Sequence, residues 1–270
     1  MRSGPADLQK CLRSRSHFLR RLHSPRQKCE LARELEESRS TIDRALRELE
    51  RVGFVARDDS GYRTTLAGEL ALEEYDRHTD RVHGLAELQD ALTAMPTDAP
   101  LDAALFEDAD VSLPTQHSPH RPVEALEPVL ADADHVRAFG TTVIPAYVDM
   151  YYEQIVDEEM TAEVIFSTDV LEWLLSRHEE VVKTIAETEG VVLSETDDDY
   201  SFNLLVAEHG PEYGGACHER PDCSVGVMLY DEGTILGFVH NDTCQAVAWG
   251  ETLFDRLADG ADRLGTAFET

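Results

Sequence analysis

Arginine and hydroxyl side chains cluster on one side of a predicted helix near the N-terminus. The cluster consists of Arg39, Ser40, Thr41, Arg44 and Arg47. The planar guanidinium of arginine can bind guanine O6 and N7 through two hydrogen bonds or clamp a phosphate, and hydroxyl groups can donate to phosphates or base edges. These residue types on one helical face predict a contact with the major groove of double-stranded DNA.

A predicted hairpin directly after this helix carries further candidate contacts. Residues 54–57 and 62–65 are expected to form two strands around a turn at 58–61. Arg57 lies on the first strand, and Tyr62 and Arg63 lie on the second. A hairpin wing of this kind reaches the adjacent minor groove or backbone, so these residues are also predicted to contact DNA. The alternative is that this helix and hairpin belong to a module that contacts only other proteins and not DNA.

Cysteine and histidine residues are concentrated between positions 209 and 244. Cys217, His218, Cys223 and Cys244 could bind zinc, or Cys217 and Cys223 could form a regulatory disulfide. The spacing differs from the Cys-x2-Cys of common zinc fingers, and Cys244 could equally be a small buried apolar residue. Metal binding, redox sensing and a purely structural role therefore remain open for these residues.

Hydroxyl side chains also stand at the ends of two predicted strands in the C-terminal part. They are Thr141, Thr142, Ser167 and Thr168. Open α/β sheets bind small molecules at the carboxyl ends of their strands, which makes these residues candidate ligand contacts. Helix caps and turns use the same residue types, so a structural role is the alternative.

Enzyme motifs are absent from the sequence. It contains no G-x-S-x-G, no Walker loop and no dinucleotide fingerprint. The run of carboxylates at 197–199 is expected to be a solvated turn between strands rather than a cation site. We therefore predict that the protein is not an enzyme, and an enzyme built on the C-terminal domain is the rival from another class.

The candidate DNA contacts need a helical scaffold, which residues 1–65 predict. Helices are expected over 7–22, 25–35 and 39–52. Ser24 and Pro25 predict the start of the second helix, Ser38 caps the third, and Gly53 ends it. Two short helices joined by a tight turn form a helix-turn-helix. With the hairpin, residues 1–65 are predicted to be a winged helix-turn-helix domain.

Residues 66–100 are predicted to connect this domain to the remainder of the chain. A long helix is expected over 66–92, and the proline-containing segment 93–100 is expected to be a linker. The helix carries a partial apolar seam made of Leu66, Leu70, Val82, Leu85, Leu88 and Leu92. This seam predicts either a homodimer, because two recognition helices on one duplex need a spacing element, or packing on the helix's own domain.

Strands and helices alternate in residues 101–270. Strands are predicted over 135–145, 161–168, 190–195 and 201–208, with a late hairpin over 224–230 and 234–240. Helices are predicted over 122–133, 146–159, 169–188 and 247–264. This alternation predicts an α/β sheet with an antiparallel hairpin, and an α+β class for the whole chain.

The net charge is strongly negative and unevenly distributed. The 270 residues include 54 Asp and Glu against 24 Lys and Arg, only three of which are Lys, for a formal charge of −30. Acid excess together with lysine scarcity indicates a protein from a halophile, because charges are screened within about 3 Å at 1 M salt; an ordinary acidic protein is the alternative. Residues 1–65 carry a net +5, which favours a nucleic-acid-binding module.

Several protein classes are excluded by the same composition. The longest uncharged run, 138–148, is too short to span a membrane, and the N-terminus lacks the apolar core of a secretory signal. Five cysteines are too few for a disulfide scaffold. A cytoplasmic protein without a membrane partner is therefore predicted.

Residues 7–70 resemble the winged helix-turn-helix of archaeal and bacterial transcription regulators. The residues that carry the resemblance are Leu31-Ala32, Leu35, 38–42, Leu46, Leu49, 53–55, Gly61-Tyr62, Thr65 and Gly68. The resemblance implies a DNA-binding domain in this part of the chain.

Residues 101–265 resemble the effector domain of archaeal winged-helix regulators of the methanogenesis-regulator (Fil-type) family. The similar pieces are Phe139-Gly140, 143–145, 161–175, 229–233, Gly237, 248–251 and Leu253-Phe254. The resemblance implies a ligand-sensing domain related to the phospholipase-D-like effector domains of archaeal sugar-sensing regulators. No lysine lies two residues after a histidine, so the His-x-Lys-x4-Asp chemistry of that enzyme family is not carried over.

The sequence as a whole predicts a DNA-binding transcription regulator. Its C-terminal domain is expected to sense a small-molecule effector and to modulate operator binding. The alternative is a regulator that responds to metal or to thiol oxidation through Cys217, Cys223 and Cys244. The sequence establishes no cofactor, and zinc is the metal that these cysteines could hold.

Overall fold

The computed structural model describes residues 4–210 and 222–264, and it divides the chain into two compact units. The N-terminal unit extends to Thr79 and the C-terminal unit begins at Asp80. The mixed content of helices and a large sheet confirms the predicted α+β class.

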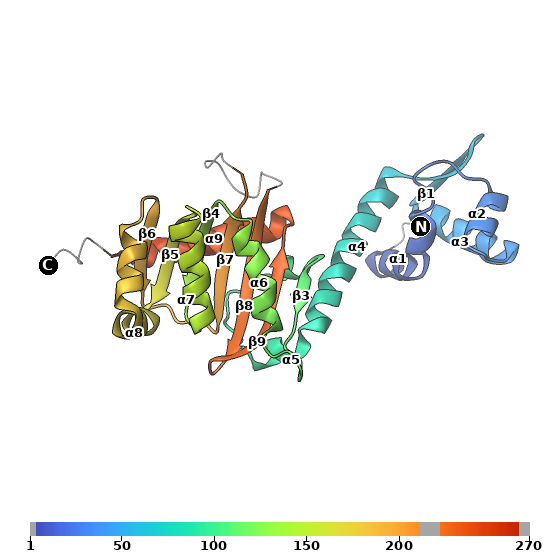
Figure 1. Ribbon diagram of the computed structural model, residues 1–270. Coiled ribbons are helices and arrows are strands. Elements are labelled where there is room, and N and C mark those ends of the chain that lie inside the picture. The colour runs from blue at the N-terminus through green and yellow to red at the C-terminus, as the bar shows by residue number, and fades with distance from the viewer. Residues whose placement is uncertain (1–3, 211–221, 265–270) are drawn as a thin grey trace. The chain divides into compact units, whose positions relative to one another are not determined.

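The N-terminal unit consists of three helices, a two-stranded antiparallel hairpin and the first part of α4, the helix that begins at Leu66 (Figure 1). The helices are α1 (Pro5–Leu19), α2 (Lys28–Glu34) and α3 (Arg39–Val52), and the strands are β1 (Val55–Asp58) and β2 (Gly61–Thr64). Their core is built around Phe18, Leu31, Ile42 and Leu49, all at most 1% exposed. The buried residues of α3 are spaced three and four apart and form one apolar stripe, which faces this core.

Helix α3 begins and ends where its sequence predicted. The hydroxyl of Ser38 accepts a hydrogen bond from the amide of Thr41 at 3.2 Å, which satisfies one of the free amides of the first turn. Gly53 ends the helix with a left-handed φ of 82°, a conformation that costs glycine little.

Helix α2 begins later than predicted, and the cap at Ser24 and Pro25 is a wrong prediction. Arg26 instead pairs with Tyr62 of the hairpin, through two backbone hydrogen bonds of 2.9 Å each. A β-carbon on Gly61 would lie 2.5 Å from the carbonyl oxygen of Arg26, so only glycine permits this approach. Gln27 then caps α2, with its amide donating to the carboxylate of Glu30 at 2.7 Å.

The C-terminal unit is built on one mixed sheet of eight strands, in the order β10-β6-β5-β4-β7-β8-β9-β3. The strands are β3 (Asp110–Ser112), β4 (His135–Gly140), β5 (Thr161–Ser167), β6 (Val191–Thr196), β7 (Phe202–Glu208), β8 (Cys223–Asp231), β9 (Thr234–Asn241) and β10 (Asp262–Arg263). Only β4, β5 and β6 run parallel to one another, and the other pairs are antiparallel, including the β8–β9 hairpin that the sequence predicted.

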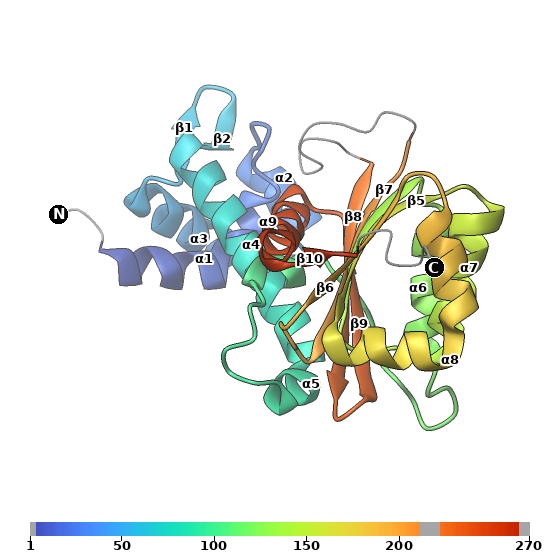
Figure 2. The ribbon, with the colours of Figure 1, turned by 90° about the vertical axis from the view of Figure 1, so that its left-hand side faces the viewer.

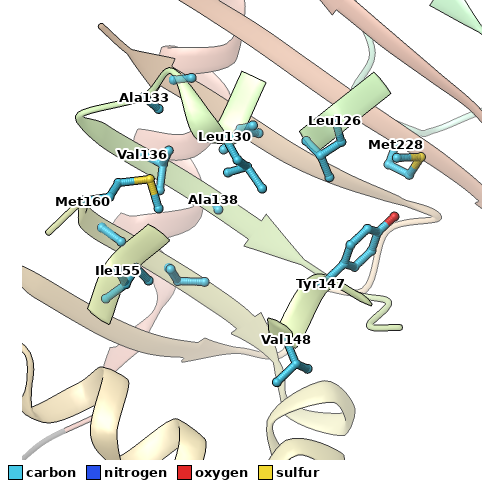
Figure 3. Close-up of a cluster of buried hydrophobic side chains, with 14 of the residues drawn as sticks. Leu126, Leu130, Ala133, Val136, Ala138, Tyr147, Val148, Ile155, Met160 and Met228 are labelled. Atoms are coloured by element: carbon cyan, nitrogen blue, oxygen red, sulfur yellow. The ribbon is translucent and has the colours of Figure 1, made fainter. Parts of the chain in front are cut away.

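Helices cover both faces of this sheet (Figure 2). One face carries α6 (Arg121–Ala131), α7 (Pro145–Tyr152), the π-helical turn η2 (Glu153–Asp157) and α8 (Thr168–Glu187). The other carries α5 (Gln89–Ala94), the 3-10 helix η1 (Ala103–Phe106) and α9 (Cys244–Gly260). The sheet is therefore enclosed between two apolar cores, part of one of which appears in Figure 3.

The predicted long helix over 66–92 and the linker over 93–100 differ from the structure. Helix α4 (Leu66–Glu87) ends before Leu88, and α5 follows. Leu88 is fully buried and Met95 is 8% exposed, both in the core of the C-terminal unit. This stretch packs on the sheet because its apolar side chains are buried there, whereas in an exposed linker they would remain in contact with water. No helix among the described residues has the length and apolarity that a bilayer crossing needs.

The close packing of α9 on the sheet predicts how alanine substitutions of its glycines change the stability of the protein. A β-carbon on Gly250 would lie 2.7 Å from one methyl of Val225 and 3.2 Å from one of Val206, so Gly250→Ala should lower the free energy of unfolding by about 1–3 kcal/mol. Gly260, at the end of the same helix, has no atom within 4 Å of the corresponding point. Gly260→Ala should therefore leave stability unchanged or raise it by up to about 1 kcal/mol.

Denaturant unfolding of both variants in concentrated KCl measures this difference. Equal stability of the two alanine variants would contradict the packing described for α9.

Candidate nucleic-acid interface

The exposed side of α3 brings the first group of predicted contacts together. Arg39, Ser40, Arg44 and Arg47 are exposed, and Thr41 is half-buried. The hydroxyl of Ser38 lies 2.8 Å from that of Ser40 and 2.9 Å from that of Thr41. The start of the helix therefore presents a group of hydroxyls beside arginines, next to the positive end of the helix dipole.

Two acidic residues on α3 are neutralised by neighbouring cations. The ammonium of Lys28 lies 2.5 Å from the carboxylate of Asp43, and this hydrogen bond lowers the pKa of Asp43. Glu48 lies 2.8 Å from the guanidinium of Arg15 and 3.0 Å from that of Arg44, and these contacts lower its pKa as well. Both carboxylates stay ionised, but their charge is matched locally.

Arg39 and Arg47 form no ion pair on this side of α3. Neither has an ion-pair partner among the residues that the structure describes. The Nε of Arg47 donates to the backbone carbonyl of Asp43 at 3.0 Å, which orients the guanidinium along the helix. These two arginines are therefore the cations of α3 best placed to bind an anionic partner, whereas Arg44 shares its charge with Glu48.

The three predicted contacts of the hairpin differ in exposure: two are exposed arginines and one is a buried tyrosine. Arg57 and Arg63 are exposed, and Arg63 lies 3.6 Å from Asp58. Tyr62 is only 4% exposed, and its ring lies 5.6 Å from the Nζ of Lys28 and 5.5 Å from the guanidinium carbon of Arg57. Tyr62 therefore supports the cations of this surface from beneath through cation–π contacts.

Basic residues are concentrated in the unit that carries this surface. The residues up to Thr79 include 16 Lys and Arg and 14 Asp and Glu, whereas those from Asp80 include 8 and 40. An electrostatic footprint for a polyanion therefore exists only in the N-terminal unit.

The four predicted ligand contacts of the C-terminal unit do not form one site. Thr141 donates its hydroxyl hydrogen bond to the carbonyl of Tyr200 at 2.6 Å, and Thr168 donates to the carbonyl of Thr196 at 3.4 Å. Ser167 is buried at the end of β5. Of the four, Thr142 lines the wall of a cavity of about 100 Å³ between α7, α8 and the sheet, and the other three do not line this cavity.

This cavity escaped the sequence analysis. Its walls are aliphatic and aromatic side chains from separate elements, and Tyr147 and Tyr151 of α7 and Asn203 of β7 supply polar atoms. The one available sequence signal was the pair of tyrosines four residues apart on a predicted helix, which places both on one face.

The predicted metal or redox group lies only partly within the described residues. Cys217 and His218 fall outside them. Cys223 is buried at the start of β8 and is disulfide-bonded, and Cys244 is an exposed free thiol. His240 lies in the same stretch of the sequence, and burial lowers the pKa of its imidazole. The described residues contain no group of three side chains able to hold a metal ion.

Two family models match the chain. Residues 119–260 match the family described as the methanogenesis regulatory protein FilR1, middle domain. Residues 6–87 match the family described as the HVO_A0261 N-terminal domain. No curated protein matches the sequence.

Several solved structures are distantly similar. TrmBL2, an archaeal chromatin protein described as showing a novel mode of DNA binding, is 13% identical with a TM-score of 0.42, over 97% of this chain and 100% of its own. NucT from Helicobacter pylori is 5% identical, and the phospholipase D family member Nuc from Salmonella typhimurium is 7% identical. Both have TM-scores of 0.41, over 58% of this chain and 99% of theirs. Similarity this low does not decide a function.

The geometry of α3 and the hairpin predicts different effects for Arg47 and Arg63. Arg47→Ala should weaken binding to a preferred duplex by about 1–3 kcal/mol and relax sequence preference, because it removes a donor from the helix face. Arg63→Ala should weaken binding to all duplexes alike and lower the salt slope by about 1, because it removes a backbone contact.

Fluorescence anisotropy with duplexes selected by the wild-type protein, over a range of KCl concentrations, measures both effects. Arg256→Ala on α9 removes the same charge from an exposed position of the C-terminal unit and serves as the control. Unchanged affinity in both N-terminal variants would contradict the assignment of this surface.

Proposed function

This chain belongs to the family of the methanogenesis regulatory protein FilR1, middle domain, and we propose that it is a DNA-binding transcription regulator of the cytoplasm. In this proposal the N-terminal unit is a winged helix-turn-helix and the C-terminal unit senses a small-molecule effector. The observation that carries the DNA-binding part is the side of α3 on which Arg39 and Arg47 are exposed and form no ion pair, while Asp43 and Glu48 are paired.

The arrangement of the N-terminal unit supports a specific way of docking. Helix α3 follows α2 after a tight turn and has the diameter that the major groove of B-DNA admits. The exposed arginines of the hairpin, Arg57 and Arg63, would then reach the neighbouring backbone or minor groove. Direct contacts by Ser40 and Thr41 near the start of α3 would add hydrogen bonds to phosphates or base edges.

The acidic composition sets the conditions under which this binding works. Counterion release supplies much of the affinity of DNA-binding proteins at low salt, and it weakens as salt increases. In the molar salt for which the composition of this chain is suited, affinity would depend more on direct hydrogen bonds and on shape. The pairing of Asp43 and Glu48 keeps two carboxylates of α3 from opposing the phosphates.

Selection of bound fragments from sheared genomic DNA in concentrated KCl tests the proposal. The full chain should enrich a short motif repeated in inverted orientation, with half-site centres about one helical turn, 10–10.5 base pairs, or a multiple of it apart. The double variant Arg39→Ala/Arg47→Ala is the matched control and should enrich nothing. Enrichment by neither protein would overturn the proposed function.

We propose in addition that the chain is a homodimer that uses α4. The four exposed large apolar side chains in the described part of the chain are Leu66, Leu70, Val82 and Leu85, and all of them lie on this helix. Their exposures range from 37% to 70%. Leu88 and Leu92, the remaining members of the predicted seam, pack in the core of the C-terminal unit and are not available for a dimer.

A charge on α4 tests this dimer. Leu70→Glu places a carboxylate where an apolar contact is proposed and should convert the dimer to a monomer at micromolar concentration. His83→Glu introduces the same group at an exposed position on the opposite side of α4 and should leave the mass unchanged. Light scattering in concentrated KCl reports the mass, and a wild-type monomer would contradict the proposal.

The alternative effector is a metal or an oxidant acting at Cys217, Cys223 and Cys244. The disulfide at Cys223 favours the redox version over a zinc site, because a zinc ligand must be a free thiolate. Metal content per chain, followed by thiol titration before and after peroxide, distinguishes the two. One zinc per chain supports the metal version, and loss of thiols together with altered DNA affinity supports the redox version.

A further inference from the structure

We propose that the cavity between α7, α8 and the sheet binds a small, uncharged and mainly apolar molecule that carries one hydrogen-bond acceptor. The regulatory meaning of this site rests on the proposed function, but its chemistry is argued from the cavity itself. The cavity lies in the C-terminal unit, on the face of the sheet that α6, α7 and α8 cover.

The walls of the cavity select for apolar ligands. No charged side chain lines it, and its surface is formed largely by aliphatic and aromatic groups such as Leu126, Val164, Phe166, Leu174, Val182 and Leu193. Its volume of about 100 Å³ accommodates a molecule of roughly one aromatic ring, and apolar cavities of similar size bind such molecules. Sugars and nucleotides would lose more hydrogen bonds to water than these walls return.

One side chain fixes the polar end of the cavity. The Oδ1 of Asn203 accepts from the amides of Thr141 and Thr142 at 3.0 and 3.1 Å. Its Nδ2 donates to the carbonyl of Thr142 at 2.8 Å and to the hydroxyl of Tyr230 at 3.2 Å. The amide of Asn203 is thereby fully occupied, and it holds the loop between β4 and α7 in place.

The tyrosine pair next to Asn203 has a hydroxyl hydrogen in excess. The hydroxyls of Tyr147 and Tyr230 lie 2.7 Å apart, and one hydrogen suffices for the bond between them. Because Asn203 acts toward Tyr230 as a donor, the second hydrogen has no acceptor among the described residues. Tyr147 lines the cavity and projects from α7 toward Met228 of β8 (Figure 3).

Two further observations support a neutral ligand with an acceptor. Burial raises the pKa of Tyr147 to about 12, so its hydroxyl remains protonated and can donate at neutral pH. Tyr151, four residues further along α7, also lines the cavity, and no hydrogen bond of its hydroxyl is found among the described residues. A carbonyl, ether or alcohol oxygen on the ligand would satisfy these donors.

The surroundings of the cavity disfavour anions. Val148 and Val181 line both the cavity and an adjoining hollow, whose other residues include Asp149, Glu153 and Asp157. Three carboxylates beside the cavity would repel an anionic ligand. The π-helical turn η2 and the non-helical backbone of His178 in α8 border the same hollow, so the cover of the cavity is built from interrupted helix.

Calorimetric titration of the full chain in concentrated KCl tests this assignment with four probes. Benzyl alcohol is neutral and carries one oxygen, toluene lacks the oxygen, benzoate is anionic and glucose is polar throughout. Benzyl alcohol should bind about threefold to tenfold more tightly than toluene, the difference expected for one hydrogen bond. Benzoate and glucose should not bind.

Two variants and one control locate the binding. Ala138→Leu adds three carbons to the floor of the cavity and should abolish binding of both aromatic probes. Tyr147→Phe removes the hydroxyl and should bring the affinity for benzyl alcohol down to that for toluene. Tyr152→Phe removes a hydroxyl from the neighbouring hollow and should leave both affinities unchanged.

The outcomes separate this inference from the proposed function. Absence of aromatic binding to the wild type, or unchanged binding in both Ala138→Leu and Tyr147→Phe, would overturn the cavity assignment even if the chain binds DNA. Binding of benzyl alcohol by a chain that selects no DNA would overturn the proposed function and leave the cavity assignment standing.

Discussion

The charge of the chain is the constraint on which its functional surfaces depend. With 54 carboxylates and 24 basic residues, a surface able to meet a polyanion must concentrate its cations and neutralise the acids among them. On α3 this holds for two of the three carboxylates. Lys28 from α2 pairs with Asp43, and Arg15 from α1 pairs with Glu48, whereas Glu50 is exposed and has no ion-pair partner among the described residues. The C-terminal unit, with 8 basic and 40 acidic residues, has a charge that repels such a partner.

In the C-terminal unit the constraint on which the candidate site depends is the set of hydrogen bonds made by the side chain of Asn203. This residue is half-buried, and its side-chain amide makes hydrogen bonds with all of its donors and acceptors, to the loop after β4 and to Tyr230. This loop leads into α7, whose tyrosines face the cavity. The same amide thus holds the loop that joins the first parallel strand to α7, beside the tyrosine pair that has a hydroxyl hydrogen in excess. A site with one polar end and apolar walls is the result.

Local signals allowed much of the candidate DNA surface to be predicted. The stripe of α3, its cap at Ser38, its end at Gly53 and the exposed arginines follow from residues close together in sequence. Tyr62 was predicted to contact DNA because it lies on a strand of the hairpin wing, yet its ring packs beneath Lys28 and Arg57. Lys28 lies 34 positions earlier in the chain, so no local pattern could reveal this contact.

The sequence by itself determined the α+β class, the order of most helices and strands, and the uneven charge, because hydrophobic periodicity, helix caps and composition act over a few residues. Tertiary structure decided the late start of α2, where Arg26 pairs with Tyr62. It also decided the burial of Leu88 and Met95 against the sheet, and the cavity, whose lining comes from residues 126–238. These features depend on strand order and on side chains meeting from distant segments, and neither is encoded in the spacing of neighbouring residues.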